Sequence, residues 1–140
     1  MEGIIVKEWE AAYLAGIIDG EGSITLTKNH KNEFRRPCIS IASTDLELLD
    51  FLKTITGGTI ANKKNYNPRK HKNSFTLTIR KKETVMDLLA SISGFLRVDK
   101  KKKRANLILE NYDKVTPRNG KYCPVLLNEK QLFEEEFFKI

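Results

Sequence analysis

The residue best placed for chemistry is Glu21, a carboxylate flanked by Gly20 and Gly22. The residues before it, Trp9–Asp19, carry apolar side chains at helical spacing, and an alternating strand pattern begins at Ile24. Glycines are favoured where a helix ends and the backbone must turn. The sequence therefore predicts that Glu21 lies at the rigid C-terminal end of a helix, directly before a strand. Taken alone, such a glutamate would be an ordinary exposed acid.

A second candidate for chemistry is the basic run Lys100–Arg104, which opens a later predicted helix. Its side chains either bind phosphate through charge or form a solvated helix face. His30 and His71 lie in lysine-rich, loop-like segments without the spacing of a zinc site. Cys38 and Cys123 also lack metal-ligand spacing, so we interpret them as free thiols in a reducing compartment.

Length and charge limit the class of protein. The 140 residues fit one domain, and 25 Lys and Arg against 18 acids give a net charge of +7. This excess favours a polyanionic partner without naming it. No apolar run approaches the ~20 residues of a membrane span. The first residues, Met1–Val6, form a short apolar patch interrupted by Glu2 and do not look like a signal peptide, so we expect an intracellular protein of a bacterial or archaeal cytoplasm or an organelle.

The helix that positions Glu21 has one bulky face and one small face. Leu14, Ile17 and Ile18 form the bulky face, which we expect to meet a core. A glycine inside a helix costs about 1 kcal/mol relative to alanine, so its presence indicates that another backbone comes close. The residues of this small stripe are Ala12, Ala15, Gly16 and Asp19.

The rest of the chain alternates between strand and helix patterns. Turn residues, caps and periodicity predict two hairpins and further helices. The predicted segments are strands at Ile24–Thr27 and Phe34–Ala42, a helix capped by Thr44 and Glu47 and stopped at Gly57–Gly58, strands at Thr59–Lys64 and Ser74–Arg80, a helix ending at Gly94, a helix opening at Asp99, a turn at Pro117–Gly120 and a last helix capped by Asn128. The pattern is an α+β, αββαββα order with an antiparallel sheet, followed by C-terminal helices. We expect one domain, 1–140, with a core of about 8–113 and a helical extension of about 114–140.

All four predicted strands keep acids off the face opposite their apolar residues. That face carries Ser, Thr, Asn, Lys or Arg, which suits a phosphate polyanion, although a merely solvated face remains the alternative. A two-stranded antiparallel ribbon fits the major groove of DNA.

The string Leu14–Gly22, LAGIIDGEG, resembles the signature of the LAGLIDADG homing endonucleases. It departs from that signature at Gly20, where the signature has Ala, and at Glu21, which replaces the second Asp. The resemblance implies the αββαββα fold with a saddle-shaped sheet and a site-specific double-strand DNA endonuclease. Because the motif occurs once, it also implies a homodimer on a long near-palindromic DNA site, with the stripe Ala12, Ala15, Gly16 and Asp19 at the seam or, for Asp19, capping backbone.

The resemblance further implies the catalytic residues. Two carboxylates at paired helix ends repel each other unless a cation lies between them, and oxygen ligands suit Mg²⁺, with Mn²⁺ or Ca²⁺ as substitutes. Glu21 of each subunit is then the metal ligand, with the Gly20 carbonyl as a secondary one. Ser43 and Lys101 would support the hydrolytic water and phosphate. Lys103 is the near alternative to Lys101, and a different alignment of the family pattern with this segment places the basic position at Asp99 instead. The DNA-facing positions would be Thr25, Thr27, Asn29, Lys31, Arg36, Cys38, Ser40, Ala61, Lys63, Ser74, Thr76 and Thr78.

Other functions remain open at this point. A LAGLIDADG scaffold without cleavage could act as a DNA-binding regulator or as a maturase that assists splicing of an intron RNA. A generic basic RNA-binding protein would explain the charge but would leave the motif unexplained.

Overall fold

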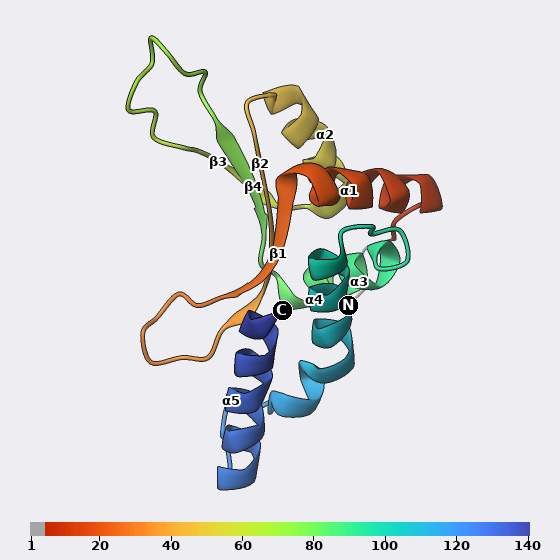
Figure 1. Ribbon diagram of the computed structural model, residues 1–140, viewed down its shortest axis with the longest axis vertical. Helices are drawn as coiled ribbons and strands as arrows, with labels where there is room; N and C mark the ends of the chain where they lie inside the picture. The colour runs from red at the N-terminus through yellow and green to blue at the C-terminus, as the bar shows by residue number, and fades with distance from the viewer. Residues whose placement is uncertain (1–4) are drawn as a thin grey trace.

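The computed structural model describes residues 5–140, so the first four residues of the apolar patch Met1–Val6 lie outside the described part. The observed elements follow the predicted order (Figure 1). They are α1 (Glu8–Glu21), β1 (Gly22–Thr27), β2 (Arg36–Ser43), α2 (Leu46–Thr56), β3 (Thr59–Asn62), β4 (Phe75–Ile79), α3 (Lys82–Ile92), α4 (Asp99–Asn111), the short 3-10 helix η1 (Asp113–Val115) and α5 (Pro124–Lys139). Among the described residues, no helix has the length and apolarity that crossing a bilayer requires.

The four strands form one antiparallel sheet in the order β1-β2-β4-β3, which confirms the predicted α+β fold class. Helices α1, α2 and α3 cover one face of the sheet, and Figure 1 shows the opposite face uncovered between the β1–β2 and β3–β4 loops. The alternating apolar residues point toward the helices; Ile39, Ile41 and Leu77 are completely buried there. The core therefore lies on one side of the sheet and leaves a polar face on the other.

Helix α2 begins differently from the prediction. The prediction that Thr44 and Glu47 cap this helix is wrong, because Asp45 is the N-cap and makes no side-chain capping bond. Instead, the Asp45 backbone N–H donates to Ser43 Oγ at 3.0 Å. The predicted stop at Gly57 is confirmed: its φ of 70° is left-handed, and its N–H donates to the Lys53 carbonyl.

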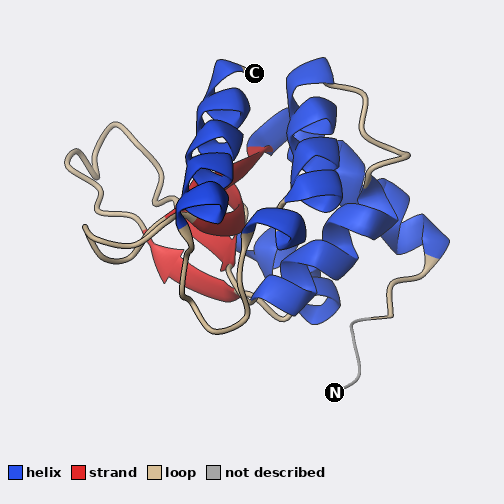
Figure 2. Ribbon diagram, turned by 90° about the horizontal axis from the view of Figure 1, so that it is seen from below, coloured by secondary structure: helices blue, strands red, loops and turns tan. Residues whose placement is uncertain are grey.

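Helix α5 begins at Pro124, four residues before the predicted cap Asn128. Proline suits a first helical position because its fixed φ is helical and its missing N–H would have had no partner. The helix is anchored by Glu134, which accepts from the Arg35 guanidinium at 2.9 Å and from the Arg35 backbone N–H at 3.1 Å. Helix α5 packs against η1 and α4, and Figure 2, seen from below, shows this helix ending at the C-terminus.

A lysine of α5 is buried beside the segment that follows α4. Lys130 is only 1% exposed, and its Nζ donates to Thr116 Oγ1 at 2.7 Å while lying 4.2 Å from the centre of the Tyr112 ring. Removing the ammonium from water disfavours its charged form. Burial accordingly lowers the pKa of Lys130 from 10.5 to about 8.

This lowered pKa predicts a pH-dependent stability. Between the folded pKa of about 8 and the unfolded value of 10.5, the unfolded chain binds more protons, so stability rises with pH across that window. From about pH 7 to 9.5, we expect the free energy of unfolding of the wild type to increase by roughly 2 kcal/mol relative to Lys130→Met, measured by urea denaturation. The comparison cancels the other titrating groups. Parallel pH curves for the two proteins would contradict the buried, perturbed amine.

Candidate active site and polar face

Glu21 is the last residue of α1, and its side chain is exposed. The next residue, Gly22, starts β1 without an intervening loop. A Cβ on Gly22 would lie 2.8 Å from the Ile18 Cα, so only glycine fits this tight transition. The Glu21 carboxylate makes no hydrogen bond or ion pair with any described residue. The predicted placement of an exposed carboxylate at a rigid helix end is what the structure contains.

Lys101 on α4 lies at this same helix end. Its Nζ donates to the carbonyls of Ile18 and Asp19, each at 2.7 Å. The last turn of α1 has no basic residue of its own, so Lys101 supplies the cation that favours a helix C-terminus. Lys103, the rival candidate, pairs with Asp99 at 2.9 Å on its own helix. Of these lysines, Lys101 is therefore the one bonded to the end of α1.

Asp19 faces the start of α4. Its two carboxylate oxygens accept from the backbone N–H groups of Arg97, at 2.9 Å, and Val98, at 3.0 Å. Val98 is the N-cap of α4, whose own side chain cannot cap. Of the two places predicted for Asp19, the structure has the one that caps backbone. A negative charge also suits the N-terminus of a helix.

The small stripe of α1 is only partly available to a partner. Ala12 and Gly16 are exposed, and so is Gly20 one turn further on. Ala15, which was predicted to be at the dimer interface, is 0% exposed. That prediction is wrong because Ala15 turns into the hydrophobic core with Leu14 and cannot reach another chain. The surface stripe is therefore Ala12, Gly16 and Gly20.

Aromatic residues extend this surface. The Trp9 and Tyr13 rings on α1 lie 6.4 and 5.8 Å from the Phe51 ring on α2. All three are large hydrophobic side chains that remain substantially exposed. The exposed side of α1 thus joins small residues near Glu21 to an apolar cluster at its other end.

The strand register aligns the predicted DNA-facing residues on one face. Ser40 pairs with Ser23 on one side and with Thr78 on the other, and Thr76 pairs with Ala61. The Ser23 and Ser40 hydroxyls are hydrogen bonded at 2.8 Å. The predicted positions that are exposed or half-buried on this face or in its two loops are Thr25, Thr27, Asn29, Lys31, Arg36, Ser40, Ala61, Lys63, Ser74, Thr76 and Thr78.

Cys38 does not belong to that accessible set. It has the right register, opposite Thr25, but it is only 3% exposed. Cys38 lies on β2, a central strand with β1 and β4 on its two sides. The prediction that Cys38 contacts DNA is therefore corrected: neighbouring side chains cover it.

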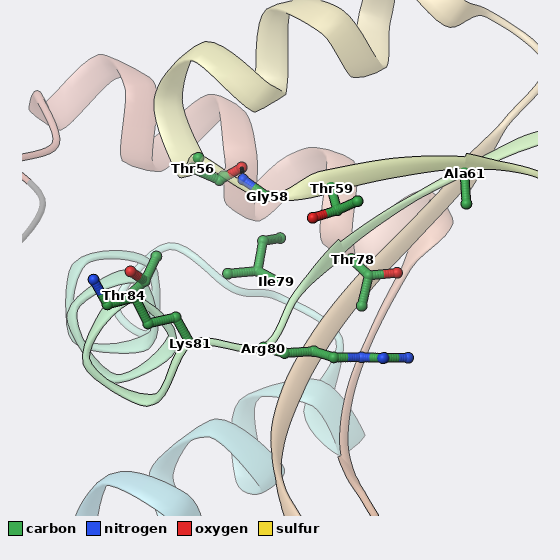
Figure 3. A pocket seen from close by; sticks show the side chains of 10 residues that line it. Thr56, Gly58, Thr59, Ala61, Thr78, Ile79, Arg80, Lys81 and Thr84 are labelled. Carbon is green, nitrogen blue, oxygen red and sulfur yellow. Dashed lines mark hydrogen bonds between the residues drawn. The ribbon is translucent and has the colours of Figure 1, made fainter. Parts of the chain in front are cut away.

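Four positions on the polar face were missed: Ser23, Ala42, Thr59 and Arg80. The two-residue alternation of their strands could have identified them. Thr59, Thr78 and Arg80 border a hollow of about 600 Å³ at the β3–β4 edge (Figure 3). No acid lines this hollow, and Lys81 adds a further positive charge.

Ser43 lies near the end of α1, but its side chain bonds the backbone at the start of α2. It is two residues beyond Ile41, the strand partner of Gly22. Strand alternation gives it the core-side direction of Ile41, and its Oγ accepts from the Asp45 N–H. The observed contact of Ser43 is thus structural.

Comparison with known proteins identifies the family. A family model described as a LAGLIDADG-like domain matches residues 8–93, more than half of the chain. No curated protein matches the sequence. The chain belongs to the LAGLIDADG family.

Solved structures share the fold. The homing endonuclease I-CvuI, in complex with the I-CreI target, superposes with a TM-score of 0.70 at 19% identity, covering 94% of this chain and 81% of that one. The archaeal intron-encoded homing endonuclease I-Vdi141I, complexed with DNA, gives 0.59 at 20% identity, covering 94% and 84%. The LAGLIDADG homing endonuclease I-SmaMI, bound to cleaved DNA, gives 0.51 at 24% identity, covering 86% and 42%.

The contacts of Asp19 predict its effect on stability. Asp19→Ala leaves two backbone N–H groups at the start of α4 without their acceptors, so we expect the free energy of unfolding to fall by about 1–2 kcal/mol in urea denaturation. Asp50→Ala, which removes an exposed acid from α2, is the matched control and should change stability by less than about 0.5 kcal/mol. Equal effects of both substitutions would contradict the capping role.

Proposed function

We propose that the protein is a site-specific double-strand DNA endonuclease that acts as a homodimer on a long, near-palindromic site. The observation that carries this proposal is Glu21: an exposed carboxylate without a structural partner among the described residues, at the fixed end of the motif helix. A carboxylate with no structural contact adds nothing to the fold, whereas a nuclease needs one beside its substrate. The acid-free polar face supplies the adjoining surface for a polyanion.

The exposed stripe Ala12, Gly16 and Gly20 supports the homodimer. Small residues one turn apart let two helices pack closely. This chain corresponds to 42% of I-SmaMI, so that protein is long enough to hold two such units. A twofold axis through α1 would bring the two Glu21 side chains together and repeat the polar face along the DNA.

A divalent metal fits the donors at this site. Among the described residues, no group of three or more His, Cys, Asp or Glu side chains could hold a metal, so a metal here would use Glu21 and the Gly20 carbonyl from both subunits. These are hard oxygen donors of the kind that Mg²⁺ prefers, with Mn²⁺ or Ca²⁺ as substitutes, and the I-CvuI structures were described with Mg and Ca. When bound, such a metal activates water and stabilises the leaving oxygen of a phosphodiester.

The chain's own groups would hold the substrate and the carboxylate in place. Lys101 and Asp19 fix the end of α1 against α4, which limits how far Glu21 can move. Polar side chains such as Thr25 and Thr78 would read base edges in the major groove directly or through water. The β3–β4 loop adds positive charge for backbone phosphates with Lys64, Arg69, Lys70 and Lys72.

The second candidate is a LAGLIDADG scaffold without cleavage: a DNA-binding regulator, or a maturase acting on intron RNA. Both would use the polar face, but neither has a use for two acids brought together at helix ends. Such an arrangement costs free energy unless a cation offsets the repulsion. The free Glu21 therefore favours cleavage.

The cleavage role is tested with Glu21→Gln. We expect DNA binding within about threefold of the wild type but cleavage reduced by at least about 100-fold, because the amide retains the shape and loses the charge that holds metal. A plasmid library cut in Mg²⁺ and sequenced measures cleavage, and a gel shift measures binding. Glu8→Gln, at the opposite end of α1, is the control. Undiminished cutting by Glu21→Gln would remove this residue from the mechanism.

The homodimer is tested with Gly16→Arg. A Cβ on Gly16 meets nothing within 4 Å, so the subunit should fold normally while a long charged side chain blocks close helix packing. We expect sedimentation to show a dimer for the wild type and a monomer for this variant at about micromolar protein. Asn128→Arg on the exposed side of α5 should remain dimeric. A wild type that is monomeric and fully active would refute the shared site.

A further inference from the structure

A second basic cavity lies away from Glu21, between the β1–β2 loop, the turn after η1 and α5. Its volume is about 570 Å³. We call it the C-terminal pocket. The lining residues that carry the argument are Arg36, Lys82, Tyr112, Arg118, Tyr122 and Lys130. Neither the family motif nor the proposed cleavage site includes it.

Lys130 is the buried charge of this pocket. Its ammonium has three N–H donors, and Thr116 Oγ1 is its one hydrogen-bond acceptor among the described residues. The rings of Tyr112, Phe34 and Phe133 surround the rest of the group at 4.2, 5.9 and 5.9 Å from Nζ. Aromatic faces stabilise a cation but do not replace an anionic acceptor. A ligand oxygen entering the cavity could supply that acceptor.

The other charges leave the pocket positive. Arg35 is neutralised by Glu134, and Lys82 by Asp113. Glu33 is the one acid among the lining residues; it accepts from the Asn29 and His30 backbone N–H groups and lies 3.9 Å from Arg36, an exposed pair of weak attraction. Arg118 and Lys130 lie within ion-pair distance of no carboxylate in the described part of the chain. One is at the mouth, in the exposed Pro117–Gly120 turn, and the other is buried.

A purely structural role explains Lys130 poorly. An apolar side chain of the same length would pack against the three rings without desolvating a charge, and such replacements are often neutral or stabilising. Burial lowers the pKa of this amine by more than the attraction of the nearby Glu134 carboxylate raises it, so its charged form is held at a cost near neutral pH. A bound anion would offset that cost.

We propose that the C-terminal pocket binds a phosphate group, with Lys130 as its buried ligand and Arg118 as its rim ligand. A phosphate presents several acceptor oxygens and one or two negative charges, which match the remaining donors of Lys130 and the fork of an arginine. The pocket adjoins the polar face through Arg36, the strand partner of Thr27. The phosphate then comes from one of two sources. One is the backbone of DNA that extends beyond the sheet, and this alternative rests on the proposed function. The other is free phosphate, which is independent of it.

The first experiment uses inorganic phosphate. At constant ionic strength and about pH 7, phosphate replacing chloride should raise the melting temperature of the full chain by several degrees. In ¹H–¹⁵N spectra, it should shift signals of Arg36, Tyr112, Arg118 and Lys130. Lys130→Met should abolish both responses, and Arg118→Gln, in an exposed turn where misfolding is not expected, should weaken them at least about threefold. Lys53→Met on α2 removes the same charge outside the pocket and should respond as the wild type does.

The second experiment identifies the source with duplex DNA. If a DNA phosphate occupies the pocket, Arg118→Gln should weaken binding about 3- to 10-fold and reduce the salt dependence of log K by about one, and phosphate should compete. Unchanged DNA binding with a phosphate response assigns the site to free phosphate. The phosphate-binding proposal is refuted if DNA binding is unchanged in Arg118→Gln and, in addition, either the wild type shows no phosphate response or Lys130→Met responds equally. Loss of cleavage in Glu21→Gln leaves all these readouts untouched, so the two proposals can fail separately.

Discussion

The structure depends on a reciprocal contact between two helix ends. Asp19, in the last turn of α1, accepts from the N–H groups that precede α4, and Lys101, in the first turn of α4, donates to the last carbonyls of α1. Asp19 thus provides acceptors for N–H groups at the start of α4, and Lys101 adds a donor to two carbonyls in the last turn of α1, one of which, Ile18, also accepts from the Gly22 N–H. Each charge matches the sign that the other helix dipole favours. This contact fixes the end of α1, and with it the carboxylate of Glu21.

The same contact separates the two acids of the family motif by role. The Asp19 carboxylate accepts two backbone hydrogen bonds, whereas the carboxylate of Glu21, two residues later, is exposed and remains available. Gly22 allows β1 to follow α1 directly, because a larger residue would collide with Ile18 and force the helix and strand apart. A structural acid and an available acid can therefore stand side by side in one turn.

The two faces of the sheet have different roles. Its helical face is filled by aliphatic side chains, and its open face carries hydroxyls and basic groups with no acid among the strand positions. Charge is also distributed unevenly at the C-terminal end: Arg35 and Glu134 pair and hold α5, but Lys130 is buried among aromatic rings with a single hydroxyl acceptor among the described residues. The first arrangement serves stability, and the second makes that end of the molecule receptive to an anion.

The sequence alone determined the family motif, the element order and the sidedness of the strands, because these follow from local spacing of one residue type along the chain. It could not assign caps reliably: Thr44 and Asn128 had cap-like neighbours, but Asp45 is the N-cap of α2 and α5 starts at Pro124, because several nearby residues can all cap a helix. Only the tertiary structure decided that Ala15 is core and Cys38 is covered. It also joined Asp19 to residues about 80 positions away and buried Lys130, since such contacts depend on which elements pack together.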